Sequence, residues 1–211
     1  MDSIQLLFST EPPTAVGQSK WWGAPDLPKG HPYPVVEMEQ DGERWHEPLT
    51  FLCQVHLPDI APLDTEGWLP REGMLYFFAA IDYFLDDSDL LPASMGEWPS
   101  DCVRVIYSPS DTNLEPYVLT WEGTGESVFR EPVSMTFAKA EEREAEFKLL
   151  GKPYYEEINE QYEDSILLLQ VDENDDWGLR FYDCGMLCLL MHREDLLAQR
   201  WDKAFGYLHS F

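Results

Sequence analysis

The residues with the clearest chemical potential are the carboxylates of one acidic segment that begins at Asp172. Counted from Asp172, oxygen-bearing side chains stand at positions 1, 3 and 5, and Asp183 stands at position 12, as in a calcium-binding EF-hand loop. Trp177 occupies position 6, where that loop needs a glycine for its sharp turn. The flanking segments are typical of strands, whereas an EF-hand has flanking helices. We therefore expect an acidic turn between strands, with a calcium loop as the alternative.

Motifs for catalysis or for a cofactor are absent from the sequence. It contains no Gly-x-Ser-x-Gly elbow, phosphate-binding loop, dinucleotide fingerprint or His-Glu-x-x-His pair. Cys184 and Cys188 are four residues apart, but in a strand this spacing separates them by about 13 Å, too far to share one zinc ion. We therefore predict no cofactor and no metal site, and no catalytic residue is assigned. A non-contiguous site is recognised only by geometry.

The charge of the chain predicts its class of partner. Forty acidic residues against 14 basic ones give a formal net charge of -26. Such a field repels nucleic acid and anionic membranes and attracts cationic proteins, although solubility or salt tolerance would also explain it. We expect a basic protein partner and no nucleic-acid or membrane partner. The candidate contacts are the carboxylates of three acidic loops: Asp86, Asp87, Asp89, Glu156, Glu157, Glu160, Asp172, Glu173, Asp175 and Asp176.

Two tryptophans and two glutamines are further candidates for binding. Trp68 and Trp98 stand beside acidic or proline-rich loops and are candidate interface anchors, because aromatic residues often dominate the affinity of protein interfaces. Gln54 and Gln170 each close an apolar strand. We expect these amides to hydrogen-bond a neighbouring loop backbone; the alternative is that both face a pocket between the two halves of the chain.

The elements that must position these residues are mostly strands. Apolar runs predict strands at 49–55, 74–81, 102–107, 166–171 and 186–191. The Ala-, Glu- and Lys-rich stretch 136–150 predicts a helix that ends at Gly151, a second short helix is expected at 194–201, and 154–164 is expected to be a loop. No apolar run approaches the roughly 20 residues that span a bilayer, and the N-terminus lacks the features of a signal peptide. A cytoplasmic location is the expectation.

The same sequence pattern occurs twice in the chain. Phe51–Val55 is echoed by Leu167–Val171, and Gly73–Phe78 is echoed by Gly185–Leu190. The order of the motifs is the same in both halves. This predicts one domain over residues 1–211 with similar halves at about 1–125 and 137–211. The fold class is α+β: a mainly antiparallel sheet with a few short helices and an internal pseudo-duplication.

Six short motifs in this order resemble the YwqG-like family of bacterial proteins. In the N-terminal half the resemblance is carried by Ser19–Pro28, Phe51–Val55 and Gly73–Phe78, and in the C-terminal half chiefly by Leu168–Asp172 and Asp183–Gly185. It covers nearly the whole chain. That family is a domain of unknown function. The resemblance therefore implies a mixed, internally duplicated fold and supplies no reaction, catalytic residue or cofactor.

The sequence favours a non-enzymatic acidic binding protein. One specific form is an immunity-type inhibitor that masks the basic site of a bacterial toxin, since complementary charge selects a partner. The alternative is a small-molecule-binding protein or hydrolase with its pocket between the two halves. A third possibility is a scaffold without a discrete site. The oligomeric state stays open.

Overall fold

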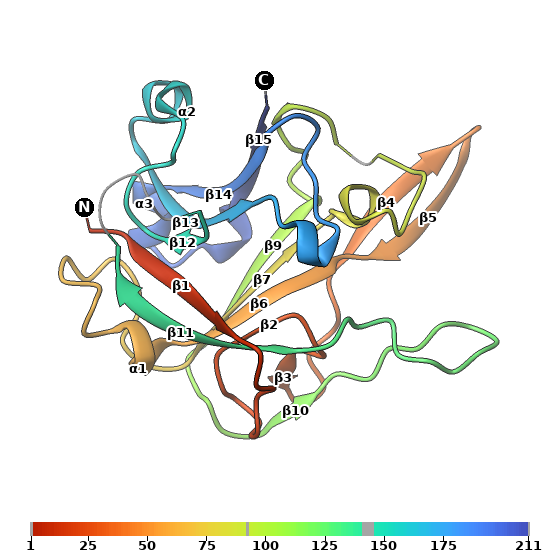
Figure 1. Ribbon diagram of the computed structural model, residues 1–211, viewed down its shortest axis with the longest axis horizontal. Helices are drawn as coiled ribbons and strands as arrows, with labels where there is room; N and C mark the ends of the chain where they lie inside the picture. The colour runs from red at the N-terminus through yellow and green to blue at the C-terminus, as the bar shows by residue number, and fades with distance from the viewer. Residues whose placement is uncertain (1, 92, 141–145, 211) are drawn as a thin grey trace.

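The computed structural model describes residues 2–91, 93–140 and 146–210 (Figure 1). An eleven-stranded antiparallel sheet dominates it. In spatial order its strands are β8 (Gly96–Glu97), β15 (Phe205–His209), β14 (Met186–His192), β13 (Ser165–Asp172), β12 (Lys148–Leu149), β1 (Ile4–Ser9), β11 (Val133–Lys139), β2 (Lys20–Trp21), β6 (Thr50–His56), β7 (Met74–Ala79) and β9 (Val103–Ser108). The sheet curls into a half-barrel (Figure 1).

The remaining elements are short. Two small antiparallel pairs lie outside the main sheet: β3 (Asp26–Pro28) with β10 (Leu114–Pro116), and β4 (Val35–Gln40) with β5 (Glu43–Pro48). The α-helices are α1 (Leu57–Ile60), α2 (Glu156–Gln161) and α3 (Arg193–Leu197), and the 3-10 turns are η1 (Asp82–Leu85), η2 (Asp175–Trp177) and η3 (Trp201–Lys203). A mainly antiparallel sheet with a few short helices is thus confirmed. In the part of the chain described here, no helix has the length and apolar character needed to cross a membrane.

The centre of the sheet is formed by two strands that are far apart in the sequence, β1 near the N-terminus and β11 at residues 133–139. β1 and β11 pair with each other; on its outer side β1 pairs with β12, and β11 pairs with β2. In the next pairing outward, Lys20 lies opposite Gln54 on one side and Lys148 lies opposite Gln170 on the other. The β6–β7 pair has a register shift between Phe51 and Cys53, and the β13–β14 pair has one between Leu167 and Leu169.

The core is formed mainly by two antiparallel strand pairs, β6–β7 on one side of the sheet and β13–β14 on the other. All six residues of β7 are buried, and five or six consecutive residues are buried in β6, β13 and β14. Such uninterrupted burial explains why these strands are continuous apolar runs in the sequence. The rings of Trp21 and Trp177 stack 5.6 Å apart, and Phe8 and Phe147 pack against both. This aromatic cluster joins the N-terminal and C-terminal parts of the chain.

Two expectations about local structure are wrong. Within the stretch 136–150, residues 136–139 end β11 and Lys148–Leu149 form β12, while 141–145 lie outside the described residues. Phe137 lies opposite Leu6 at the centre of the sheet, so pairing with the distant β1 overrides the local helix propensity. The segment 154–164, expected to be a loop, contains α2, whose Ile158 is buried against β13 and β14 residues.

Candidate functional site

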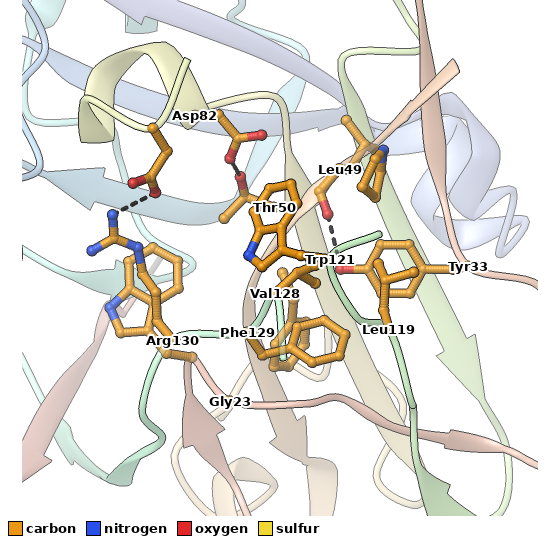
Figure 2. Close-up of a pocket in the computed structure, with 14 residues that line it drawn as sticks. Gly23, Tyr33, Leu49, Thr50, Asp82, Leu119, Trp121, Val128, Phe129 and Arg130 are labelled. Carbon is orange, nitrogen blue, oxygen red and sulfur yellow. Dashed lines mark hydrogen bonds and ion pairs between the residues drawn. The ribbon is translucent and has the colours of Figure 1, made fainter. Parts of the chain in front are cut away.

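The candidate site is a pocket of about 80 Å³ beside the start of β6. Its walls are aromatic, and they come from segments that are far apart in the sequence. Figure 2 shows Trp121 and Phe129 on one side, Tyr33 on another, and Asp82 and Arg130 across the pocket. Trp121 is 57% exposed, which is unusual for a tryptophan in this protein. The pocket therefore combines apolar ring surface with charged groups at its edge.

Asp82 is placed in the pocket by the strand pairing beneath it. Thr50 begins β6 and lies opposite Ala79 at the end of β7, so η1, which follows β7, returns over Thr50. The Thr50 hydroxyl donates a hydrogen bond to the Asp82 carboxylate (Figure 2). Burial raises the pKa of Asp82, and the charges of Asp87 and Glu47 add to this effect. The Thr50 hydrogen bond and the charge of Arg130 lower the pKa without cancelling the rise. Among the lysines and arginines that the structure describes, none forms an ion pair with Asp82.

Arg130 closes the other side of the pocket and is already paired. Its guanidinium lies 2.6 Å from the Asp87 carboxylate and donates a 3.1 Å hydrogen bond to the carbonyl of Trp177 in η2. It also lies over the Trp22 ring, 5.9 Å from the centroid. These contacts tie the pocket to both η1 and η2. Arg130 forms its ion pair with Asp87, and its charge also acts through space on Asp82, which has no ion pair of its own among the described residues.

Two of the three predicted acidic loops lie side by side next to this pocket. The backbone N–H of Arg180 donates to the carbonyl of Phe84, and the Phe84 ring packs 5.1 Å from Phe181. These contacts join η1 to the segment that follows η2, and Asp86 and Asp89 line one open cavity together with Arg180. The two acidic loops therefore lie on one side of the molecule. We call their surface the η1–η2 acidic face; it consists of Asp86, Asp87, Asp89, Asp175 and Asp176.

The charge of this face is only partly compensated. Arg130 pairs with Asp87, and Arg180 pairs with Asp175 at 3.1 Å. No ion pair among the described residues involves the other three carboxylates of the face, Asp86, Asp89 and Asp176. The face therefore presents three uncompensated negative charges to solvent.

The other predicted acids do not join this face. Glu156, Glu157 and Glu160 lie on α2, which Figure 1 shows well away from it. Glu173 turns inward, where its carboxylate accepts hydrogen bonds from the backbone N–H groups of Phe181 and Gly185. Asp172 accepts a hydrogen bond from the Glu173 N–H, and burial raises the pKa of Asp172.

The segment considered as a calcium loop forms a capped turn. Asn174, which precedes η2, accepts a hydrogen bond from the N–H of Trp177 at the end of η2, and Glu173 binds backbone N–H groups as described above. Asp175 is paired with Arg180. Across residues 2–91, 93–140 and 146–210, no group of three or more His, Cys, Asp or Glu side chains is arranged to hold a metal ion.

Gln54 and Gln170 both bind loop backbone. The side-chain oxygen of Gln54 accepts from the N–H of Asp26 at 2.8 Å, and its amide nitrogen donates to the Gln18 carbonyl at 2.8 Å. The side-chain oxygen of Gln170 accepts from the N–H of Tyr154, also at 2.8 Å. Both glutamines are fully buried, and neither lines the pocket at Asp82.

The two predicted tryptophan anchors have different surroundings. Trp98 is only 2% exposed and stacks on Phe84, and its indole N–H donates to the Ser94 carbonyl. The expectation that Trp98 contacts a partner at the surface conflicts with this burial. Trp68 is half-buried beneath the Arg193 guanidinium, 5.0 Å from its ring centroid. Tyr83 and Tyr182 are exposed beside Asp86 and Asp89. Trp121 is exposed at the pocket, and the sequence patterns did not single it out.

A second polar cluster lies in an open cavity of about 570 Å³ at the end of β6. One ring nitrogen of His56 lies 2.9 Å from Asp59, and the other lies 3.3 Å from Asp111. Burial lowers the pKa of His56, but the two carboxylates outweigh it and raise the pKa above its ordinary value. The Ser19 hydroxyl donates to Asp59 and not to the imidazole. Both ring nitrogens are therefore held by carboxylates, which favours a charged clamp over a general base.

The sequence of the chain matches one known protein family. A family model described as a domain of unknown function (DUF1963) matches residues 19–208. The chain belongs to this family. A search of curated proteins found no match. The matched range contains the pocket and the whole η1–η2 acidic face, so both are built on the framework of the family domain.

Proposed function

We propose that this protein is a non-enzymatic binding protein that holds a basic partner protein on the η1–η2 acidic face. The observation that carries the proposal is the convergence of two acidic loops, more than 80 residues apart in the sequence, beside a pocket with aromatic walls. Three carboxylates of the face have no basic partner among the described residues. A partner with a positive surface would supply the missing charges.

The physical roles of charge and aromatic surface differ in such an interface. Complementary charge accelerates encounter and rejects wrong partners, whereas buried aromatic anchors supply most of the affinity. Trp121 is positioned for the second role, because its ring is largely exposed at the edge of the pocket. A partner that covers the face would bury this ring together with the uncompensated carboxylates.

The proposed partner has a specific form. A basic bacterial toxin held by an immunity-type inhibitor fits a chain whose formal net charge is -26, since the positive active site of a nuclease is attracted to such a surface. We propose further that the protein is YwqG-like and that it acts in the cytoplasm.

We also propose that the two halves of the chain arose by duplication. The strand order supports this. β1 of the first half pairs with β12 of the second half, and β11 of the second half pairs with β2 of the first half, so the two halves exchange their first strands at the centre of the sheet. The register shifts in β6–β7 and β13–β14 fall at matching positions, after Phe51 and after Leu167. Lys20 and Lys148, six residues before Asp26 and Tyr154, occupy matching positions opposite Gln54 and Gln170.

A small-molecule-binding protein or hydrolase with a pocket between the halves is the second candidate function. The observation that favours it is the contact of Arg130 with the Trp177 carbonyl, because it brings the C-terminal half to the rim of the pocket. If this candidate is right, a ligand of low molecular mass will occupy the pocket and the acidic face will not be needed for binding.

The test of the main proposal is affinity capture from the source organism with two matched variants. The face variant carries Asp86→Asn, Asp89→Asn and Asp176→Asn, and the control carries Glu157→Gln, Glu160→Gln and Glu163→Gln near α2. Both remove three negative charges. We expect the wild type and the control to retain one basic protein through a high-salt wash and the face variant to lose it. Equal retention by both variants would refute the assignment of the face.

A further inference from the structure

We propose that the pocket at Asp82 binds a primary alkylammonium group, the end of a lysine side chain that the basic partner inserts. This inference rests on the proposed function, because it names the group that the partner would supply. It adds a defined site and a defined chemistry to what is otherwise a charged surface.

The first argument is the unmatched carboxylate of Asp82. An ionised carboxylate has about four lone-pair sites for hydrogen bonds, and among the described residues this side chain accepts a hydrogen bond from the Thr50 hydroxyl. No described lysine or arginine pairs with it. An ammonium group carries three N–H donors and a full positive charge, so it would satisfy both the hydrogen-bonding capacity and the charge of Asp82.

The second argument is the aromatic character of the walls. Trp121, Phe129, Tyr33 and Phe51 all line the pocket, and Figure 2 shows the first three around the space next to Thr50. Tyr33 is fixed by its hydroxyl, which donates to the Leu49 carbonyl at 2.8 Å. Cations bind over the faces of such rings, and the attraction is stronger where water is excluded. Aromatic faces combined with one carboxylate are a recognition site for an organic cation.

The third argument excludes an anion as the preferred occupant. Arg130 would be the group to hold an anion, but its guanidinium already binds the Asp87 carboxylate at 2.6 Å and the Trp177 carbonyl at 3.1 Å. An anionic ligand would have to displace Asp87 and would also be repelled by Asp82. A cation meets neither obstacle, because Asp82 forms no ion pair with a described lysine or arginine and the Arg130 guanidinium across the pocket is paired with Asp87.

The fourth argument is the size of the pocket. Its volume of about 80 Å³ is several times the roughly 10–15 Å³ that one water needs, but well below the roughly 300–1,000 Å³ of pockets for drug-sized ligands. The pocket therefore admits an ammonium group with its adjoining methylenes. A lysine side chain delivers this group on a flexible stem, and the rest of the partner stays on the acidic face.

The experiment compares two small probes that differ only in the ammonium group. Nα-acetyl-lysine methylamide and Nα-acetyl-norleucine methylamide are titrated into the 15N-labelled protein, and binding is followed by NMR shifts of the indole N–H signals. We expect the lysine probe to bind about tenfold or more tightly than the norleucine probe, since a charge-assisted hydrogen bond is added. Equal binding of the two probes, or no binding of the lysine probe, would overturn the inference.

Two variants locate the effect at Asp82. Asp82→Asn keeps an oxygen that accepts the Thr50 hydrogen bond but removes the charge, so it should abolish the preference for the lysine probe. Glu157→Gln removes one charge from α2, outside both the pocket and the acidic face, and should keep the preference. If Asp82→Asn keeps the full preference in a protein with an unchanged circular dichroism spectrum, the site assignment is wrong.

The outcomes also separate this inference from the proposed function. If the partner is captured by wild type and lost by the face variant while the lysine probe does not bind, the pocket inference fails and the acidic face stands. If the lysine probe binds but the face variant still captures the partner, the acidic face fails and the pocket stands.

Discussion

Replacing either of two matching buried lysines with methionine should change the free energy of unfolding in different ways. The Lys20 ammonium lies 3.0 Å from the Asp26 carboxylate, and the side chains are 9% and 1% exposed. Lys20→Met removes the cation and leaves Asp26 buried with its charge. Breaking a buried ion pair from one side costs about 3–5 kcal/mol. Asp26 keeps hydrogen bonds from Gln54 and from the N–H of Gly17, so we expect about 3 kcal/mol.

Lys148 occupies the matching strand position but lacks the matching acid. It is 1% exposed, and Tyr154 stands where Asp26 stands relative to Lys20. None of the residues that the structure describes forms an ion pair or hydrogen bond with its ammonium. Burial lowers the pKa of Lys148, and burial also raises the pKa of the neighbouring Cys188 thiol to about 12. Lys148→Met removes a desolvated charge and keeps an unbranched apolar stem, so it should be neutral or stabilising by about 1 kcal/mol.

The assay is equilibrium unfolding in urea at pH 7, followed by tryptophan fluorescence, with both variants measured against the wild type. We predict that the urea midpoint of unfolding falls for Lys20→Met and is unchanged or higher for Lys148→Met. If Lys148→Met loses as much stability as Lys20→Met, the ammonium of Lys148 has a partner that this reasoning omits, and the contrast between the two lysines is refuted.

Three further predictions concern a pH-dependent clamp, a tight turn and metal binding. The pKa of His56 is raised in the folded state, so its protonation stabilises the fold at pH values below the unfolded pKa of about 6.5. This stabilisation is lost as the pH rises through the folded pKa. Asp111→Asn should therefore lower the free energy of unfolding in urea by about 0.5–1 kcal/mol at pH 5 and leave it unchanged at pH 9. Equal losses at both pH values would contradict this. A Cβ at Gly73 would lie 2.1 Å from the Ser108 carbonyl oxygen, and φ is +89°, so Gly73→Ala should lower the free energy of unfolding by about 2–5 kcal/mol. Gly30 has a similar φ of +79° but open space around it, so Gly30→Ala should cost only about 1–2 kcal/mol. Comparable melting temperatures of the two variants would refute the steric argument. Adding calcium should leave the melting temperature unchanged, because the acids after β13 are engaged in the turn, and a rise of several degrees would show otherwise.

The strands at the centre of the fold were predictable because of how they are buried. β6, β7, β13 and β14 lie in the core over most of their length, so they are continuous apolar runs that mark their own positions in the sequence. The stretch 136–150 was not predictable in the same way. Its composition favours a helix, but β11 is half-exposed and takes its conformation from pairing with β1, more than 120 residues away.

The candidate site was predictable only in part. Runs of acidic residues identified the two loops of the η1–η2 acidic face, because charge density is a local property of the sequence. Asp82 carried no such signal, because its place in the pocket depends on tertiary contacts such as the hydrogen bond from Thr50, 32 residues away in the chain. Trp121 and Trp98 look alike in sequence, but one is exposed at the pocket and the other is packed on Phe84. Exposure depends on tertiary packing, which a single sequence does not specify.

The central claim is that a basic partner is held by the η1–η2 acidic face and not by the negative charge of the protein as a whole. The most direct test is the equilibrium affinity of the captured partner for the wild type, the face variant and the α2 control, measured at physiological ionic strength. We predict about tenfold or greater weakening for the face variant, since three carboxylates at the interface are lost, and little change for the control. Equal affinities of the two variants for the partner would contradict the account.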